Sequence, residues 1–197
     1  MVGNVQLTAR GQLEQVHVRI EVLIAARIDE PPAVIGIAQR AEPAGTVVRE
    51  LGDTSGRDVG LEHAVRRDEG DFTVRVAASE DPADIGPCDA VLFCVKSYDT
   101  DQAAAVLGPL LRPETGVVSL QNGVDNEEKI AARIGPEHVL GGVSFILAHI
   151  AEPGVVEQIG SVRRVIFGEL DGARSERVTR LLAEFQKAEI DTELADD

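Results

Sequence analysis

Apolar residues in the middle of the chain form two short continuous runs with a segment of helical length between them. The runs are Val91–Val95 and Val117–Leu120, and the segment between them is Asp99–Leu111. Continuous apolar runs are typical of parallel strands that are covered on both faces. Alanines, valines and leucines recur at helical spacing in the intervening segment. The pattern therefore predicts two adjacent parallel strands joined by a helix, with a right-handed crossover.

Polar groups follow each of these two predicted strands. Lys96 comes directly after the first run, and Gln121-Asn122-Gly123 comes directly after the second. Ligands of such sheets bind just outside the carboxyl ends of the strands, so we expect Lys96 and Asn122 to share one binding edge. Taken alone, the pattern also fits an exposed loop lysine and an ordinary Asn-Gly turn.

The second half of the chain alternates between further strand and helix patterns. The expected elements are an edge strand over 72–76, a polar turn with a short helical piece over 79–86, a helix over 126–134, a strand over 139–147, two short strands over 155–160 and 164–168 joined by a hairpin turn, an amphipathic helix over 175–188 with Ser175 as its N-cap, and a last strand over 190–194. The order predicts an α/β fold, a partial or degenerate Rossmann-like sheet with helices on its faces.

The first 69 residues follow no such order. Val16–Val22 alternates and predicts a half-buried strand, and residues 23–28 either extend it or start a helix. The chain contains no G-x-G-x-x-G string, the pattern that lets a backbone approach the pyrophosphate of a dinucleotide. The weaker candidates Ala33–Gly36 and Gly52–Gly60 are better interpreted as turn or loop glycines. We therefore expect an atypical segment over 1–69 and a coherent portion over 70–197.

Composition narrows the range of partners. The net charge is −15, from 34 acidic and 19 basic residues, with no basic patch, which argues against nucleic acid or an anionic membrane as a partner. No apolar run approaches the length of about 20 residues that a membrane span needs, and no signal peptide is recognisable. Cys88 and Cys94 are expected to be reduced thiols, and without nearby histidines they predict no metal site. A cytoplasmic location fits these features.

Four segments resemble the ketopantoate reductase (2-dehydropantoate 2-reductase) family. They are VLFCVKSYDT at 91–100, SLQNGVDN at 119–126, VLGGVSFILAHIAEPGVVEQIG at 139–160 and VIFGELDG at 165–172. The similarity runs from about Gly70 to Asp197. It implies a Rossmann-type domain that binds NADPH, in an oxidoreductase that reduces the 2-keto acid ketopantoate to pantoate in pantothenate biosynthesis.

The resemblance also implies roles for individual residues. Asn122 matches the family asparagine that contacts the cofactor and the substrate region, and Lys96 matches the family lysine near the cofactor. Ser144–Leu147 matches the segment that passes the nicotinamide end. The family's proton-donating lysine corresponds to a position just beyond Asp197, as does the helical C-terminal domain that binds the keto acid. We therefore identify no catalytic residue in this chain.

Two expectations about function follow from the missing motifs. NADPH is expected to bind weakly, because the glycine-rich turn supplies the phosphate donors. The chain alone is expected not to reduce ketopantoate at a useful rate. Two alternatives remain open: a non-catalytic fragment that keeps the family fold, and an interaction module that forms homo-oligomers.

Overall fold

The computed structural model describes residues 21–26, 34–39, 59–68, 70–79, 81–152 and 155–196. They form one mixed α/β structure. The strands are β1 (Glu21–Ala26), β2 (Val34–Gln39), β3 (Val59–Arg66), β4 (Phe72–Ser79), β5 (Ala90–Phe93), β6 (Gly116–Ser119), β7 (Val139–Glu152), β8 (Val155–Glu169) and β9 (Asp191–Leu194). The helices are α1 (Pro82–Ile85), α2 (Thr100–Ala104), α3 (Asn126–Ile134) and α4 (Glu176–Lys187), with 3₁₀ turns η1 (Ser97–Asp99), η2 (Gly108–Leu110) and η3 (Pro136–His138).

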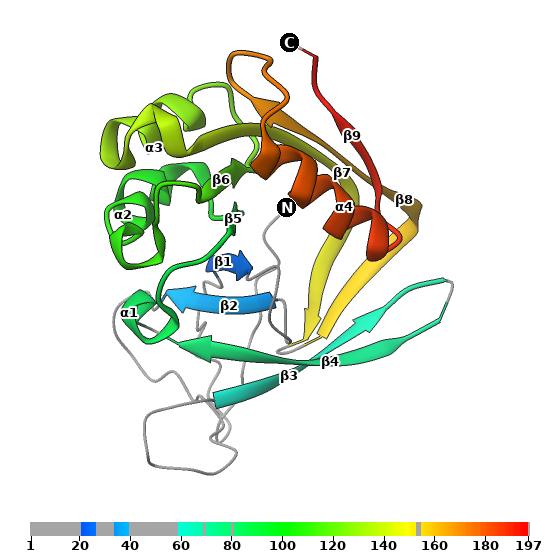
Figure 1. Cartoon of the computed structure of the whole chain (residues 1–197). Helices are drawn as coiled ribbons and strands as arrows, with labels where there is room; N and C mark the ends of the chain where they lie inside the picture. The colour runs from blue at the N-terminus through cyan, green and yellow to red at the C-terminus, as the bar shows by residue number, and fades with distance from the viewer. Residues whose placement is uncertain are drawn as a thin grey trace.

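All nine of these strands belong to one curled sheet. Their order is β3-β4-β2-β1-β5-β6-β7-β8-β9, and β3 also pairs in parallel with the start of β8, so the sheet closes on itself (Figure 1). The neighbours β5, β6 and β7 are mutually parallel. This parallel part, flanked by helices, is the Rossmann-like portion that the sequence predicts.

The predicted parallel pairing of β5 and β6 is confirmed, whereas the predicted helix between them is wrong in extent. The register places Ala90 opposite Gly116 and Phe93 opposite Ser119. Between the strands the chain forms the five-residue helix α2 and then the separate 3₁₀ turn η2. Pro109 explains the break, because proline has no N–H to donate and disfavours the α-helical conformation of the residue before it.

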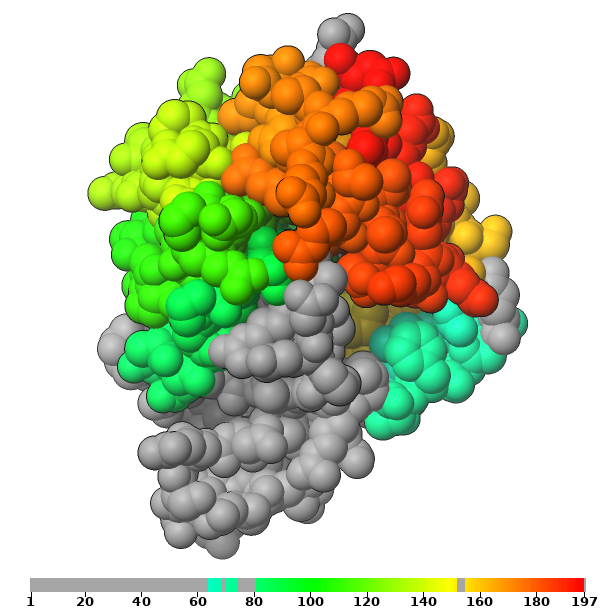
Figure 2. Space-filling view, in the orientation of Figure 1, coloured from blue at the N-terminus to red at the C-terminus, as the bar shows by residue number. Residues whose placement is uncertain are grey.

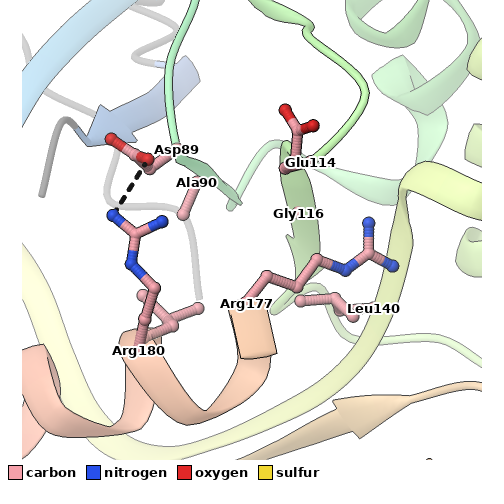
Figure 3. A pocket seen from close by; sticks show the side chains of 8 residues that line it. Asp89, Ala90, Glu114, Gly116, Leu140, Arg177 and Arg180 are labelled. Carbon is pink, nitrogen blue, oxygen red and sulfur yellow. Dashed lines mark ion pairs between the residues drawn. The ribbon is translucent and has the colours of Figure 1, made fainter. Parts of the chain in front are cut away.

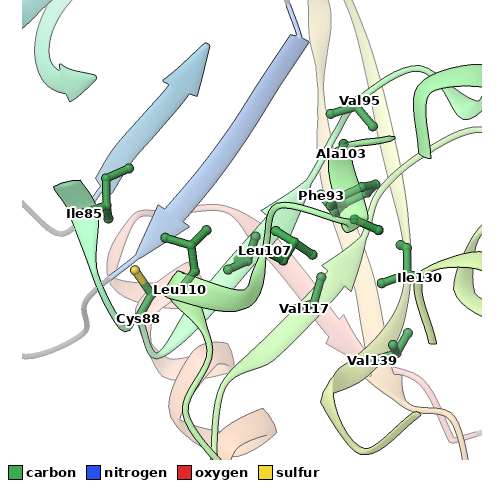
Figure 4. Packing of buried hydrophobic residues seen from close by; sticks show 12 residues of the cluster. Ile85, Cys88, Phe93, Val95, Ala103, Leu107, Leu110, Val117, Ile130 and Val139 are labelled. Atoms are coloured by element: carbon green, nitrogen blue, oxygen red, sulfur yellow. The ribbon is translucent and has the colours of Figure 1, made fainter. Parts of the chain in front are cut away.

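Helices cover both faces of the parallel strands. On one face, α1, α2 and α3 enclose a cluster that includes Val91, Phe93, Val117, Leu107, Leu110 and Ile130 (Figure 4). On the other face, α4 packs Val178, Leu181 and Phe185 against Val118, Leu140 and Phe167. Both helical layers reach the surface shown in Figure 2, with α2 and α3 in green to yellow-green and α4 in orange. The double coverage explains why Val117 and Val118 are both fully buried.

Helix α4 begins where the sequence predicts, and its first turn forms a shielded ion pair with the end of β8. Ser175 caps the helix by accepting from the Val178 N–H. The Arg177 guanidinium donates to both carboxylate oxygens of Glu169, at 2.8 and 2.6 Å, and to the Glu137 carbonyl at 2.7 Å. The pair is largely shielded, with side-chain exposures of 19% and 12%. Arg177 thus ties α4 to the end of β8 and to the segment before β7.

Two strand predictions from the second half need correction. Strand β4 is not an edge strand, because it pairs with β3 on one side and with β2 on the other. The predicted hairpin turn at Gly160-Ser161 is also wrong. Strand β8 is one strand that pairs along β7, with Ile146 opposite Arg163 and Ala148 opposite Gln158. Residues 159–162 bulge out of this ladder, so Gly160, with φ +72°, marks a bulge instead of a turn.

The described part of the N-terminal segment departs from a dinucleotide-binding start. Residues 23–26 continue β1 as a strand, while residues 16–20 of the predicted strand and 52–58 of the second glycine candidate lie outside the described ranges. Gly36 lies inside β2 and Gly60 inside β3, so the interpretation of these two glycines as turn or loop residues is wrong. Strand β1 runs antiparallel to β5, whereas the strands of a dinucleotide-binding half are parallel.

The Arg177–Glu169 pair predicts a pH-dependent stability. Burial raises the pKa of Glu169, but hydrogen bonds from Arg177 and Ser175 lower it more, so the pKa lies below its ordinary 4.5. The free energy of unfolding should therefore fall as the pH drops below about 4.5, because the unfolded chain takes up the proton first. Arg177→Met should lower the free energy of unfolding at pH 7 by about 2 kcal/mol and flatten this acid dependence, measured by urea denaturation.

Arg174→Met is the matched control, because Arg174 and Asp196 form an ion pair with side chains that are 61% and 83% exposed. Its effect should stay within about 0.5 kcal/mol. Equal losses in the two variants would contradict the assigned role of Arg177.

Candidate functional site

The carboxyl ends of β5 and β6 bring Lys96 and Asn122 to the same edge of the sheet. Phe93 and Ser119 are register partners, and Lys96 and Asn122 each follow their strand's partner by three residues. The Lys96 residue is partly buried and Asn122 is exposed. The predicted placement is confirmed, and the functional roles of the two residues stay predictions.

The segments that carry these two residues are fastened to each other. The Leu120 N–H donates to the Phe93 carbonyl at 3.0 Å, which extends the strand pairing by one step. Beyond it, the Gln121 side-chain amide donates to the Val95 carbonyl at 2.8 Å and to Thr100 Oγ1 at 2.9 Å. The Gln121 side chain therefore continues the contact between the two segments after the backbone hydrogen bonds of β5 and β6 end.

The turn after Asn122 depends on a glycine. Gly123 has φ +136°, a backbone conformation that residues other than glycine rarely adopt. A Cβ atom at this position would also lie 2.7 Å from Asn126 Nδ2. That nitrogen donates to the Asn122 carbonyl at 3.2 Å from the first turn of α3. Gly123 thus lets the chain pass close enough for α3 to hold Asn122.

Strand β7 extends past this edge and adds an apolar surface. Val118 pairs with Leu140, so the residues from Val143 onward lie beyond the end of β6. Gly142 permits the close approach, because a Cβ atom there would lie 2.9 Å from the Ser119 carbonyl oxygen. Val143 and Phe145, which we call the β7 strip, are 44% and 45% exposed. The segment Ser144–Leu147 noted in the sequence therefore belongs to the same edge as Lys96.

Two buried polar atoms at the end of β6 have no hydrogen-bond partner in the described part of the chain. They are the Ser119 hydroxyl oxygen and the Gln121 side-chain oxygen. Buried polar groups are nearly always hydrogen-bonded, so each exception calls for an explanation, such as a functional role or a bound water. Their position agrees with a polar site at this edge.

Sequence reasoning missed two residues that connect the edge, Thr100 and Asn126, and it gave Gln121 no role of its own. Thr100 and Asn126 are fully buried polar residues. The available signal was a polar residue at the start of each helix that follows a strand of the β5–β6 pair. That signal is weak, because such residues are also ordinary helix-start residues.

A small pocket lies at the opposite edge, where β5 and β6 begin. Its lining includes Asp89, Glu114, Arg177 and Arg180 (Figure 3). Three of these four charged residues are paired within the protein, since Asp89 pairs with Arg112 and lies 3.5 Å from Arg180, and Arg177 pairs with Glu169. This pocket faces away from the edge that carries Lys96 and Asn122.

The described residues include few other groups that could form a metal site or carry out catalysis. No three His, Cys, Asp or Glu side chains there are grouped to hold a metal ion. Cys88 and Cys94 are free thiols, the first buried and the second exposed. His149 lies 3.6 Å from Glu157 on the neighbouring strand, as an ordinary cross-strand pair. No helix among the described residues is long and apolar enough to cross a membrane.

Comparison with known proteins identifies the family. The chain matches the family model of ketopantoate reductase PanE/ApbA over residues 57–172, which is more than half of its length. That family is one of NAD(P)-binding oxidoreductases with a Rossmann-like domain. Within that class, the chain belongs to the ketopantoate reductase PanE/ApbA family.

Curated relatives and solved structures agree with this assignment. The chain is 34% identical over 161 residues to the 2-dehydropantoate 2-reductase of Halobacterium salinarum, covering 80% of this chain and 52% of the relative. It is 32% identical over 144 residues to that of Mesorhizobium japonicum, covering 63% and 43%. The crystal structure of 2-dehydropantoate 2-reductase from Geobacter metallireducens GS-15 matches with 34% identity and a TM-score of 0.63, covering 76% and 48%.

The extent of these matches adds two facts. The chain spans about half the length of the curated relatives it matches. The family match begins at residue 57 and so includes β3, ahead of the start near Gly70 that the sequence motifs indicate. The family resemblance therefore reaches into the segment that looked atypical by sequence alone.

The turn at Gly123 gives a testable prediction. Gly123→Ala should lower the free energy of unfolding by about 1–3 kcal/mol, because the added Cβ atom meets both the positive φ and the Asn126 amide. Gly108→Ala is the control, since nothing lies within 4 Å of a Cβ atom there. Thermal and urea denaturation would measure both variants. If Gly123→Ala is as stable as Gly108→Ala, the close approach to Asn126 does not constrain the turn.

Proposed function

We propose that this chain forms the cofactor-binding portion of an NADPH-dependent 2-dehydropantoate 2-reductase, which reduces ketopantoate to pantoate in pantothenate biosynthesis. The observation that carries the proposal is the placement of Lys96 and Asn122 three residues beyond paired positions of adjacent parallel strands. Family membership supplies the reaction class. The two free thiols support the cytoplasm as the location of the protein.

The residues at this edge fit one end of a dinucleotide. Lys96 would offer a compact positive charge to an anionic cofactor in a chain whose net charge is −15. The Asn122 amide would both donate and accept hydrogen bonds, which suits a contact shared by cofactor and keto acid. The β7 strip would offer an apolar wall to a flat ring. When bound, NADPH supplies the hydride for the keto carbon.

The phosphate end of the cofactor finds no matching site in the described residues. Gly36 lies within a strand, and β1 runs antiparallel to β5, so these elements form no strand–glycine turn–helix unit. Each missing charge-assisted hydrogen bond is worth about 1.5–3 kcal/mol, and several together weaken binding by orders of magnitude. We therefore propose that NADPH binds this chain weakly.

Keto-acid reduction also needs a proton donor for the developing alkoxide. Besides Lys96, the described lysines are Lys129 and Lys187, which pair with Asp125 and Glu184 on helices α3 and α4. Neither pairing places a lysine beside Asn122. The proposal therefore assigns Lys96 and Asn122 to binding and orientation, and it assigns the proton donor to none of the residues described.

Titration calorimetry with NADPH tests the cofactor proposal. We expect a dissociation constant well above 1 μM, and we expect Lys96→Met to weaken binding about tenfold, as loss of about 1.4 kcal/mol would do. Lys187→Met is the control, because Lys187 lies at the far end of α4 and pairs with Glu184. A sub-micromolar dissociation constant, or equal effects of the two variants, would overturn the assignment.

Ketopantoate-dependent oxidation of NADPH tests the catalytic proposal. The purified chain should be slow by about 10²- to 10⁴-fold relative to its full-length relatives, because loss of a general acid costs that much. A rapid reaction that Asn122→Ala abolishes would show instead that this chain contains a working proton donor.

A further inference from the structure

We infer that Thr100 is a positioning residue whose hydroxyl sets the placement of Lys96 relative to Asn122. The inference rests on the proposed function, because it assigns a role to residues behind the same edge. Thr100 Oγ1 lies within hydrogen-bonding distance of groups in both segments of the edge. We call the side chains of Thr100, Gln121 and Asn126 the junction. Thr100 itself is fully buried, so it acts through its neighbours.

The segment around Lys96 is held at three consecutive carbonyl groups. The Val95 carbonyl accepts from the Gln121 amide at 2.8 Å, and the Ser97 carbonyl accepts from the Thr100 hydroxyl at 3.0 Å. The Lys96 carbonyl accepts from the Asp99 N–H at 2.8 Å. Two of these three bonds come from side chains of the junction, so the direction in which Lys96 leaves the backbone depends on them.

The segment around Asn122 is held by the same junction from the other side. Gln121, the residue before Asn122, donates to Thr100 Oγ1 at 2.9 Å. Asn126 donates to the Asn122 carbonyl at 3.2 Å, and its side-chain oxygen lies 3.4 Å from Thr100 Oγ1. One hydroxyl thus contacts the two side chains that flank and hold the Asn122 turn.

Backbone pairing alone does not set this placement. The ladder between β5 and β6 ends at Phe93 and Ser119, with one further bond from Leu120. Lys96 and Asn122 lie beyond it, and the connecting contacts that remain are side-chain bonds. Removing the Thr100 hydroxyl would leave the Gln121 donor without one acceptor in a buried setting, which favours rearrangement of both segments.

Thr115 provides a matched control at the opposite edge of the sheet. It is also fully buried, and its Oγ1 atom donates to the Cys88 carbonyl at 2.5 Å and accepts from the Arg112 N–H at 2.9 Å. It lies directly before β6 begins. Thr115→Val therefore makes the same chemical change, with the loss of comparable bonds, away from Lys96 and Asn122.

Hydrogen–deuterium exchange on the 197-residue chain tests the inference without a ligand. Thr100→Val should raise the amide exchange rates of segments 94–99 and 120–125 about tenfold or more. Thr100→Ser, which keeps the hydroxyl, should restore them. Thr115→Val should leave both segments unchanged while lowering the melting temperature by a similar amount. No increase in segment 120–125, or an equal increase in Thr115→Val, would overturn the inference.

Two further measurements also test the role of Thr100. If Thr100→Val does not fold, Gln121→Met removes the bonds to Val95 and Thr100 and should raise exchange in the same two segments; unchanged exchange would overturn the inference.

In NADPH titrations, Lys96→Met should weaken binding about tenfold in the wild-type background and less than twofold beside Thr100→Val. Absence of NADPH binding to the wild-type chain would count against the proposed function, whereas the exchange result would still decide the role of Thr100.

Discussion

The parallel pairing of β5 with β6, buried on both faces, is the constraint on which the candidate site depends. Four register pairs align the two strands, and helices on both sides exclude water from Val91, Val117 and Val118. A shift of the register by one residue would exchange the faces of these side chains and is therefore costly. Because the register cannot slip, the residues that follow the two strands arrive at one edge with a defined offset.

The edge combines three kinds of surface that the proposed binding of a dinucleotide and a keto acid would use. Lys96 contributes charge, Asn122 contributes an amide, and the β7 strip contributes an apolar face. Behind them, Thr100, Gln121 and Asn126 form a buried polar junction, whose bonds are stronger than in water because they are shielded from solvent. The fold differs from a regular dinucleotide-binding start in β1, which runs antiparallel to β5.

Two helices with clear local signals were predictable from the sequence. Helix α3 occupies 126–134 as predicted, and α4 begins after the Ser175 cap, because apolar spacing and capping groups act within a few residues. Two predictions that needed distant partners were wrong, although the parallel pairing of β5 and β6 was predicted correctly. The edge position of β4 and the hairpin turn at Gly160 depended on which strands pair, and β2, β3 and β7 decide that from elsewhere in the chain.

For the candidate site, the sequence by itself determined Lys96 and Asn122, because each follows a recognisable buried strand and lies in a family motif. Only the tertiary structure decided that Thr100 joins them. Its hydroxyl meets Gln121 across 21 positions and Asn126 across 26 positions of the chain. A hydrogen bond selects its partner by distance and angle in space, which no spacing along a sequence specifies until the strands are paired and the helices packed.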